Sequence, residues 1–238
     1  DLKVDCIINC AAYTDVRKAE GEREKAFDVN SNGVKNLVAY CEKNNLKLIH
    51  FSTDYVYNGD TINPIYEEEF VDPQNYYGFS KREGEKHIEN SKSESIVIRT
   101  SWLYSKYGNN FVNTIINKSK TIENLKVISD QFGCPTYAKD LAEAVMQILD
   151  SKGRIDRKFK IFNYSNEGST SWFNFAQKIM IISGSNIKIE PVESEYFKDE
   201  VKRPKFTNTS KSKISQFFNL KINEWEISLN HYIKKDLK

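Results

Sequence analysis

The 238-residue chain contains no apolar run approaching the roughly 18 residues of a membrane-spanning helix, so the sequence predicts no such helix. Neither sign of charge dominates, because 35 basic side chains face 33 acidic ones and leave a net charge of +2. This balance gives no electrostatic basis for binding nucleic acid or an anionic membrane. The 39% hydrophobic content suffices for one large domain or for two lobes that share a core.

Cysteine and histidine are scarce, and their spacing does not predict a metal site. The four cysteines form no Cys-x-x-Cys pair, and no histidine stands near a cysteine at ligand spacing. We expect His50, His87 and His231 to have core or surface roles, and Cys6 and Cys10 to be small buried residues. Unpaired thiols of this kind indicate a reducing compartment, and we therefore expect the cytoplasm.

The segment Tyr77-Gly78-Phe79-Ser80-Lys81 is the most informative part of the chain. Residues four apart lie on one face of a helix, so the phenol and the ammonium are neighbours. A nearby ammonium lowers the pKa of a phenol from its usual value near 10, and such a phenol can donate a proton to a developing alkoxide. The alternative is an ordinary surface helix, since the chain has 13 tyrosines.

The residues upstream of this segment favour the catalytic interpretation. Residues 46–51 form a short apolar run typical of a buried strand, and Thr53 and Asp54 follow it directly. The carboxyl ends of strands are where open α/β sheets bind their ligands. The hydroxyl of Thr53 can therefore hold a substrate oxygen in line with Tyr77.

Strands and helices alternate along the chain, which predicts an α/β fold with a doubly wound parallel sheet. We expect strands at residues 4–8, 46–51, 96–98, 125–128, 159–164 and 187–192. We expect helices at residues 19–44, 77–91, 109–120, 139–150, 172–183 and 225–232. Residues 58–75, which include Glu67-Glu68-Glu69, are predicted to be a solvated loop.

Several ordered segments together resemble the dTDP-4-dehydrorhamnose reductases, a family of extended short-chain dehydrogenase/reductases. The resemblance runs from about Cys6 to the end of the chain. The segments that carry it are Asn9-Cys10-Ala11-Ala12-Tyr13-Thr14, Ser52-Thr53-Asp54-Tyr55-Val56-Tyr57, Asn75-Tyr76-Tyr77-Gly78-Phe79-Ser80-Lys81, Arg99-Thr100-Ser101-Trp102, Asp130-Gln131-Phe132-Gly133-Cys134-Pro135-Thr136 and Arg203-Pro204.

The resemblance implies a Rossmann-like fold in two parts. Residues 1–168 would form the NAD(P)-binding domain, with part of 102–138 joining a second lobe. Residues 169–238 would form mainly that second lobe, a small α/β unit that binds the substrate.

The resemblance also implies that NADPH or NADH reduces the 4-keto group of a nucleotide sugar. Tyr77 would be the general acid, Lys81 would lower the pKa of Tyr77 and bind the nicotinamide ribose, and Thr53 would bind the substrate oxygen. The hydride would come from the nicotinamide. Catalytic roles thus fall on Thr53, Tyr77 and Lys81.

Further residues would contact the cofactor or the sugar nucleotide. Those at the cofactor, with Tyr77 and Lys81, are Ala11, Ala12, Tyr13 and Thr14. Those at the substrate, with Thr53, are Asp54, Tyr55, Trp102 and Arg203. Simpler roles stay open: strand-end packing for the alanines, turn capping for Asp54, core packing for Trp102 and a surface position for Arg203.

The family begins with a strand, a glycine-rich loop and a helix that hold the cofactor pyrophosphate. No such loop precedes Tyr77, and residue 1 stands directly before the first predicted strand. We therefore expect that roughly 50–60 residues of a first βαβ unit and its following strand are missing, and that a chain without them binds cofactor poorly. The residues that select NADPH or NADH lie in that part of the fold.

Two other functions remain open from the sequence. One is a related nucleotide-sugar reductase or epimerase with another deoxysugar as its substrate. The other is a non-catalytic regulatory subunit of the kind that accompanies methionine adenosyltransferase, which the combination of Thr53, Tyr77 and Lys81 argues against. The oligomeric state is likewise open, and a homodimer is one alternative.

Overall fold

The computed structural model describes residues 4–151 and 159–237. Within them, a parallel sheet has the strand order β1-β2-β3-β8. Its strands are β1 (Cys6–Asn9), β2 (Lys47–Thr53), β3 (Ser95–Thr100) and β8 (Lys160–Asn163). The predicted α/β fold is confirmed, and each predicted strand of this sheet lies within two residues of an observed one.

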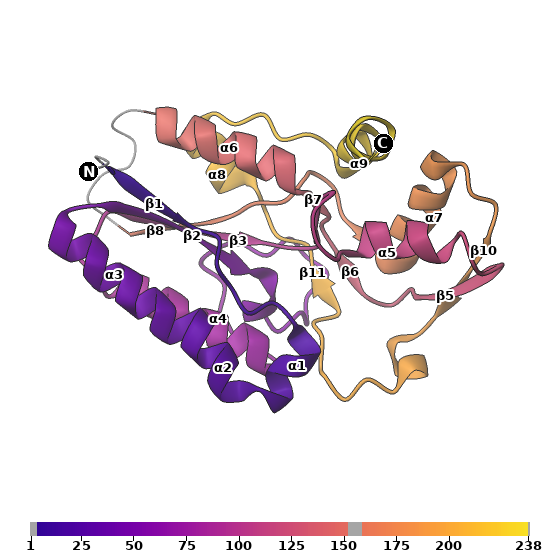
Figure 1. The fold of residues 1–238 in the computed structure, drawn as a ribbon, viewed down its shortest axis with the longest axis horizontal. Coiled ribbons are helices and arrows are strands. Elements are labelled where there is room, and N and C mark those ends of the chain that lie inside the picture. The colour runs from indigo at the N-terminus through magenta and orange to yellow at the C-terminus, as the bar shows by residue number, and fades with distance from the viewer. Residues whose placement is uncertain (1–3, 152–158, 238) are drawn as a thin grey trace.

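Helices cover both faces of this sheet (Figure 1). Alternate residues of each strand point to opposite faces. Leu48 and Val97 pack on the face covered by α3 (Gly33–Asn44) and α4 (Tyr76–Glu89). Ile49 and Ile98 pack on the other face, which α6 (Ala138–Asp150) and α8 (Ser212–Phe218) cover.

The predicted helix over residues 19–44 is interrupted. It consists of α1 (Val16–Gly21), α2 (Arg23–Phe27), a π-helical turn η1 (Asp28–Asn32) and α3. The side chain of Asn30 in η1 bonds both backbone groups of Tyr13 and the hydroxyl of Ser80. The carbonyl of Asn30 lies so close to Gly84 of α4 that a β-carbon there would be 2.2 Å from the oxygen. The π-helical turn therefore places Asn30 in contact with residues far away in the sequence. Helical periodicity alone does not predict such a turn.

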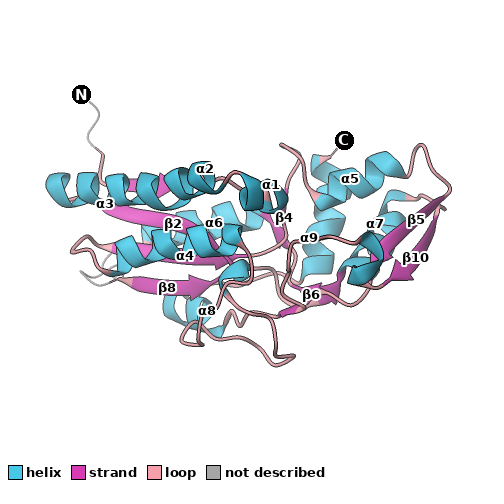
Figure 2. Ribbon diagram, turned by 90° about the horizontal axis from the view of Figure 1, so that it is seen from below, coloured by secondary structure: helices cyan, strands magenta, loops and turns pink. Residues whose placement is uncertain are grey.

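A second lobe lies beside the sheet (Figure 2). In it, β5 (Asn124–Ile128) pairs in parallel with β10 (Lys188–Val192). An aromatic core that includes Phe175 and Trp225 joins three helices. These helices are α5 (Phe111–Lys118), α7 (Trp172–Ser183) and α9 (Trp225–His231). The predicted helix over 172–183 is confirmed, and its cap is Ser171, whose hydroxyl accepts from the backbone of Asn174 at 3.1 Å.

The last third of the chain also contributes to the sheet layer. Helix α8, which the sequence did not predict, places Ile214 and Phe218 against α6 and Phe162 of β8. We therefore propose that α8 belongs to the cofactor-binding domain, and that most of residues 169–238 belong to the second lobe. No helix in the described ranges is both long and apolar enough to cross a membrane.

Two expectations about local environment were wrong. Cys6 is half-buried, because it lies on β1, which pairs only with β2 within the described residues, and Cys10 is exposed in the loop that follows this strand. Glu67, predicted to be solvated, is buried because its carboxylate accepts from the backbone N–H of Asn163 on β8 at 2.7 Å.

Candidate active site

Thr53, Tyr77 and Lys81 come together where β2 ends and α4 begins. Thr53 is the last residue of β2, and the two other residues lie in the first turns of α4. Asn75 starts that helix, and its side chain accepts from the backbone of Gly78 at 2.9 Å. The phenol of Tyr77 is hydrogen-bonded to the side chain of Thr53. The structure thus brings the three predicted catalytic residues into one cluster at a strand's carboxyl end.

The environment of Tyr77 raises its pKa. Burial is the largest cause, the hydrogen bond to Thr53 opposes it, and the charges of Asp54 and Tyr55 add to it. Lys81, predicted to lower this pKa, is not among these causes, because its amine donates to the carbonyl of Phe51 at 2.6 Å. The phenol therefore holds its proton at neutral pH, which is the form that a general acid requires.

Lys81 is almost completely buried, with 2% of its surface exposed. Burial lowers the pKa of its ammonium to about 8, although the carboxylate of Glu85 raises it. Its amine also lies 3.2 Å from Nε2 of His50. A buried lysine with such a pKa changes its charge close to physiological pH.

Asp54 has an unusual environment for a carboxylate. One oxygen accepts from the hydroxyl of Thr53 at 3.2 Å, and the other has no hydrogen-bond partner among the described residues. Burial raises the pKa of Asp54 to about 6, with the side chains of Thr207 and Thr53 opposing this shift. A buried acceptor left without a partner beside a catalytic cluster is a candidate for binding a ligand hydroxyl.

The four predicted cofactor residues form the loop that follows β1. Asn9 accepts from the backbone of Ala11 at 3.1 Å, and Asn30 accepts from that of Tyr13 at 2.8 Å. Ala11 and Thr14 are exposed, and Ala12 and Tyr13 half-buried. Since β1 pairs in parallel with β2, this loop and Thr53 lie at the same edge of the sheet. Small side chains on an anchored backbone let a flat ligand approach closely.

A cavity of about 810 Å³ is lined by residues of the second lobe and by Arg17 and Arg203, and Thr53, Tyr77 and Lys81 are not among its lining residues. Its lining combines basic residues, two acids and aromatic rings, which suits an anionic ligand with a planar group. The basic residues are Arg17, Lys126, Lys198, Lys202, Arg203 and Lys205. The sequence prediction had singled out only Arg203 among these, although the lysine-rich run from 198 to 205 is a visible signal.

Arg203 links the cavity to the catalytic cluster. Its guanidinium pairs with Asp199 at 2.8 Å, and Arg17 pairs with the same oxygen at 3.0 Å. Arg203 is also hydrogen-bonded to the phenol of Tyr55, whose ring meets that of Tyr77 edge to face at 5.8 Å. A ligand held at Arg203 therefore lies within two side chains of the proposed proton donor.

Trp102 is not a lining residue of the cavity, but it stacks on Trp172, which is one. Trp172 is among the lining residues, and the indole of Trp102 stacks on it at 3.4 Å between ring centroids. Trp102 has a φ of 44°, a left-handed conformation that is rare for a bulky side chain. This stacking packs Trp102 against the wall of the cavity, and it makes Trp172 a candidate site residue that the sequence prediction missed.

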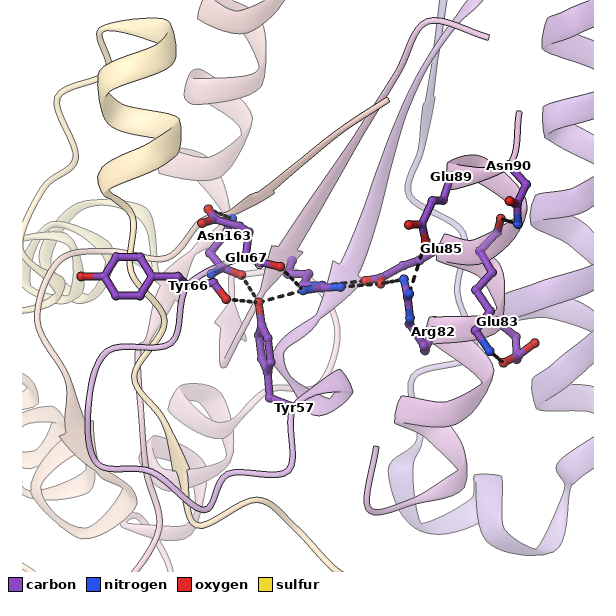
Figure 3. Close-up of polar contacts among 11 residues, drawn as sticks. Tyr57, Tyr66, Glu67, Arg82, Glu83, Glu85, Glu89, Asn90 and Asn163 are labelled. Carbon is purple, nitrogen blue, oxygen red and sulfur yellow. Dashed lines mark hydrogen bonds and ion pairs between the residues drawn. The ribbon is translucent and has the colours of Figure 1, made fainter. Parts of the chain in front are cut away.

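A buried polar network joins α4 to strands β3 and β8 of the sheet (Figure 3). Glu85 receives two hydrogen bonds from Arg99 of β3, at 2.9 and 2.8 Å. Arg99 also donates to the hydroxyl of Tyr57 at 2.8 Å, and that hydroxyl donates to Asn163 of β8 at 3.0 Å. Burial raises the pKa of Glu85, but Arg99 outweighs it and the net shift is downward. The network fixes α4, and with it Tyr77 and Lys81, against the sheet.

Comparison with known proteins places the chain in a family. The RmlD substrate binding domain model matches residues 1–237. The chain belongs to this family. It is 36% identical to the spore coat polysaccharide biosynthesis protein SpsK of Bacillus subtilis (strain 168), over 97% of this chain and 79% of that protein.

The dTDP-4-dehydrorhamnose reductase of Sinorhizobium fredii (strain NBRC 101917 / NGR234) is 35% identical to this chain, over 98% of it and 81% of the relative. The crystal structure of dTDP-4-dehydrorhamnose reductase from Bacillus anthracis strain Ames in complex with NADP superimposes with a TM-score of 0.90. It shares 36% identity and covers 95% of this chain and 79% of its own. The predicted family, fold and NAD(P)-dependent oxidoreductase class are confirmed.

Proposed function

We propose that this chain reduces the 4-keto group of dTDP-4-dehydro-L-rhamnose to give dTDP-L-rhamnose, with NADPH or NADH as the reductant. The observation that carries the proposal is the cluster of Thr53, Tyr77 and Lys81, connected through Tyr55 to Arg203 of a basic cavity, in a nucleotide-sugar reductase family. The relatives named as dTDP-4-dehydrorhamnose reductases support this choice of substrate.

In this proposal, Tyr77 donates its proton to the C4 oxygen of the sugar as that oxygen gains charge. The hydroxyl of Thr53, which donates to Asp54 in the structure, would turn to donate to the same oxygen. The unpartnered oxygen of Asp54 accepts from a sugar hydroxyl. The contacts of Tyr77 and Thr53 with the C4 oxygen strengthen as the alkoxide forms, which is how a site favours the transition state over the substrate.

The loop after β1 and Lys81 are the residues that would hold the cofactor. The anchored loop from Ala11 to Thr14 offers small side chains and a fixed backbone beside Thr53, and Lys81 offers an amine for a ribose hydroxyl. When bound, a reduced nicotinamide supplies the hydride. The diphosphate of the substrate would lie at Arg203, and its base would lie against Trp172.

A related sugar is the second candidate, because SpsK is as similar to this chain as the rhamnose reductases are. Residues of the second lobe would then select another deoxysugar nucleotide. The regulatory-subunit alternative has no such support, and the complete Thr53, Tyr77 and Lys81 cluster argues against it.

The test is NADPH and NADH oxidation with dTDP-4-dehydrorhamnose by the full-length protein that carries this chain. Turnover that falls by about 10²–10⁴-fold in Tyr77→Phe would support the proposal. A folded protein that oxidises neither cofactor with this sugar would overturn the choice of substrate, and a panel of other 4-keto sugar nucleotides would then decide between the two candidates.

A further inference from the structure

One carboxylate joins two arginines that are far apart in the sequence. Nη2 of Arg17 lies 3.0 Å from one oxygen of Asp199, and Nη2 of Arg203 lies 2.8 Å from the same oxygen. These two nitrogens therefore cannot be further apart than the sum of the two distances. Arg17 lies on α1, which packs against α4, whereas Asp199 and Arg203 lie in the segment that follows β10 of the second lobe. All three residues line the large cavity.

The pair of Arg17 and Asp199 does little for stability. The side chain of Arg17 is 70% exposed, and water screens an exposed ion pair while side-chain entropy opposes it. Asp199 is the one polar partner of Arg17 among the residues that the structure describes. A guanidinium has five N–H donors, so most of those of Arg17 are left for a ligand in the cavity.

Asp199 is ionised and fixed in place. Burial raises its pKa, but the hydrogen bonds from Arg17 and Arg203 outweigh this effect, and the net shift is downward. Its second oxygen accepts from the backbone N–H of Val201 at 3.3 Å. Arg203 is held on its other side by the phenol of Tyr55. One carboxylate thus balances only one of the two guanidiniums, and a positive charge remains at the cavity wall.

We propose that Arg17 and Arg203 together bind the diphosphate of the nucleotide sugar, and that Asp199 is a positioning residue that holds their guanidiniums side by side. A nucleotide sugar carries one negative charge on each of its two phosphates, and each guanidinium presents a fork of N–H donors that fits a phosphate. The inference deepens the proposed function and rests on it, since that function supplies the nucleotide sugar. It adds Arg17, from the side of the cavity opposite the second lobe, to the binding site.

The other charges of the cavity favour the same ligand. Lys198 and Lys202 also belong to its lining, and Glu195 is the second acid of that lining besides Asp199. The excess of positive charge attracts an anion. Trp172 of the same lining offers an aromatic face for the base of the nucleotide.

The first experiment measures the affinities of dTDP, UDP and NADPH for the full-length protein by isothermal titration calorimetry. Arg17→Gln should weaken binding of the preferred nucleoside diphosphate about tenfold and change the affinity for NADPH by less than about twofold. Arg17→Lys should recover only part of the loss, because an ammonium lacks the fork. Lys18→Gln is the matched control: it removes the same charge from the same helix at a position outside the cavity lining, and should change neither affinity.

Three results of this titration would overturn the inference: a wild-type protein that binds neither dTDP nor UDP, an unchanged affinity in Arg17→Gln, or an equal loss for NADPH. The measurement needs no turnover, so it is separate from the reductase assay. A protein that does not reduce dTDP-4-dehydrorhamnose but shows the expected dependence on Arg17 would keep this diphosphate site and lose only the proposed sugar.

The second experiment tests Asp199 with Asp199→Asn. An acid that merely faces the diphosphate would repel it, so its removal would tighten binding. A positioning residue gives the opposite sign: we expect dTDP or UDP to bind several-fold more weakly, because the two guanidiniums then repel each other and Arg17 turns into solvent. Arg17→Gln should also cost less in the Asp199→Asn background than in the wild-type protein. Tighter binding, or additive effects of the two changes, would refute the role of Asp199.

Discussion

A β-carbon on Gly78 would lie 2.2 Å from the carbonyl oxygen of Tyr55. The first turn of α4 is therefore pressed directly against the short 3₁₀ turn η2 (Asp54–Val56) that follows β2. This close approach is what lets Tyr77, on the helix, reach Thr53, at the end of the strand.

Replacement of this glycine tests the importance of that contact. In Gly78→Ala, α4 or η2 must move, because a backbone carbonyl cannot swing aside as a side chain can. We expect a loss of about 1–3 kcal/mol in the free energy of unfolding by urea, together with at least a tenfold loss of reductase activity. Gly21→Ala is the control, since its β-carbon meets no atom within 4 Å. Equal stability of the two variants would contradict the contact.

The pair of Glu85 and Arg99 offers a second test, with a matched control on the same helix. Glu85→Gln leaves the buried guanidinium of Arg99 without its counter-charge, which we expect to cost about 3–5 kcal/mol of unfolding free energy. Glu83→Gln removes an ion pair with the half-exposed Lys86 and should cost less than about 1 kcal/mol. Similar urea midpoints for the two variants would show that the network does not anchor α4.

The raised pKa of Asp54 predicts that the free energy of unfolding of the protein depends on pH. Burial raises its folded pKa to about 6 from 3.8, so the folded state binds this proton more tightly than the unfolded state does. Its contribution is fully present below pH 3.8 and is lost as the pH rises through about 6. Asp54→Asn should therefore stabilise the protein by about 3 kcal/mol at pH 8 and by much less near pH 4, while activity falls.

Urea unfolding at these two pH values checks the Asp54 prediction. Asp60→Asn, a change at an exposed position, is the control and should show no such difference. A gain in Asp54→Asn that is the same at both pH values would mean that ionisation of this carboxyl does not limit stability.

The stacked tryptophans can be separated through their neighbour Gly133. A β-carbon there would lie 2.6 Å from the indole of Trp102, so Gly133→Ala should push this ring off Trp172. We expect a changed tryptophan emission spectrum and a higher KM for the sugar nucleotide, with a smaller change in kcat, because the cavity wall moves while the catalytic cluster does not. An unchanged KM would exclude Trp172 from substrate binding.

Local signals in the sequence were sufficient for most of the elements. Strand β2 contains Leu48, Ile49 and Phe51 within a short segment, and α7 begins at a serine cap and ends at a glycine with a φ of 76°. The spacing of Tyr77 and Lys81 placed them on one face of α4. Each of these features depends on residues within a few positions of one another, which is why periodicity and capping could predict them.

The features that were missed depend on residues far apart in the chain. The π-helical turn at Asn30 follows from its contacts with Tyr13, Ser80 and Gly84. The burial of Glu67 follows from Asn163. Helix α8 covers the sheet although most of the segment around it is polar. No local pattern marks these positions.

The sequence by itself determined the family, the alternation of strands and helices, and the choice of Thr53, Tyr77 and Lys81 as the residues that we propose to be catalytic. The tertiary structure decided their chemical state. It turned the amine of Lys81 toward Phe51 and His50, left one oxygen of Asp54 unpartnered, and gathered the basic residues of 198–205 around Trp172. The physical reason is that a pKa and a hydrogen-bond direction depend on burial and on partners from other strands, which only the packed fold supplies.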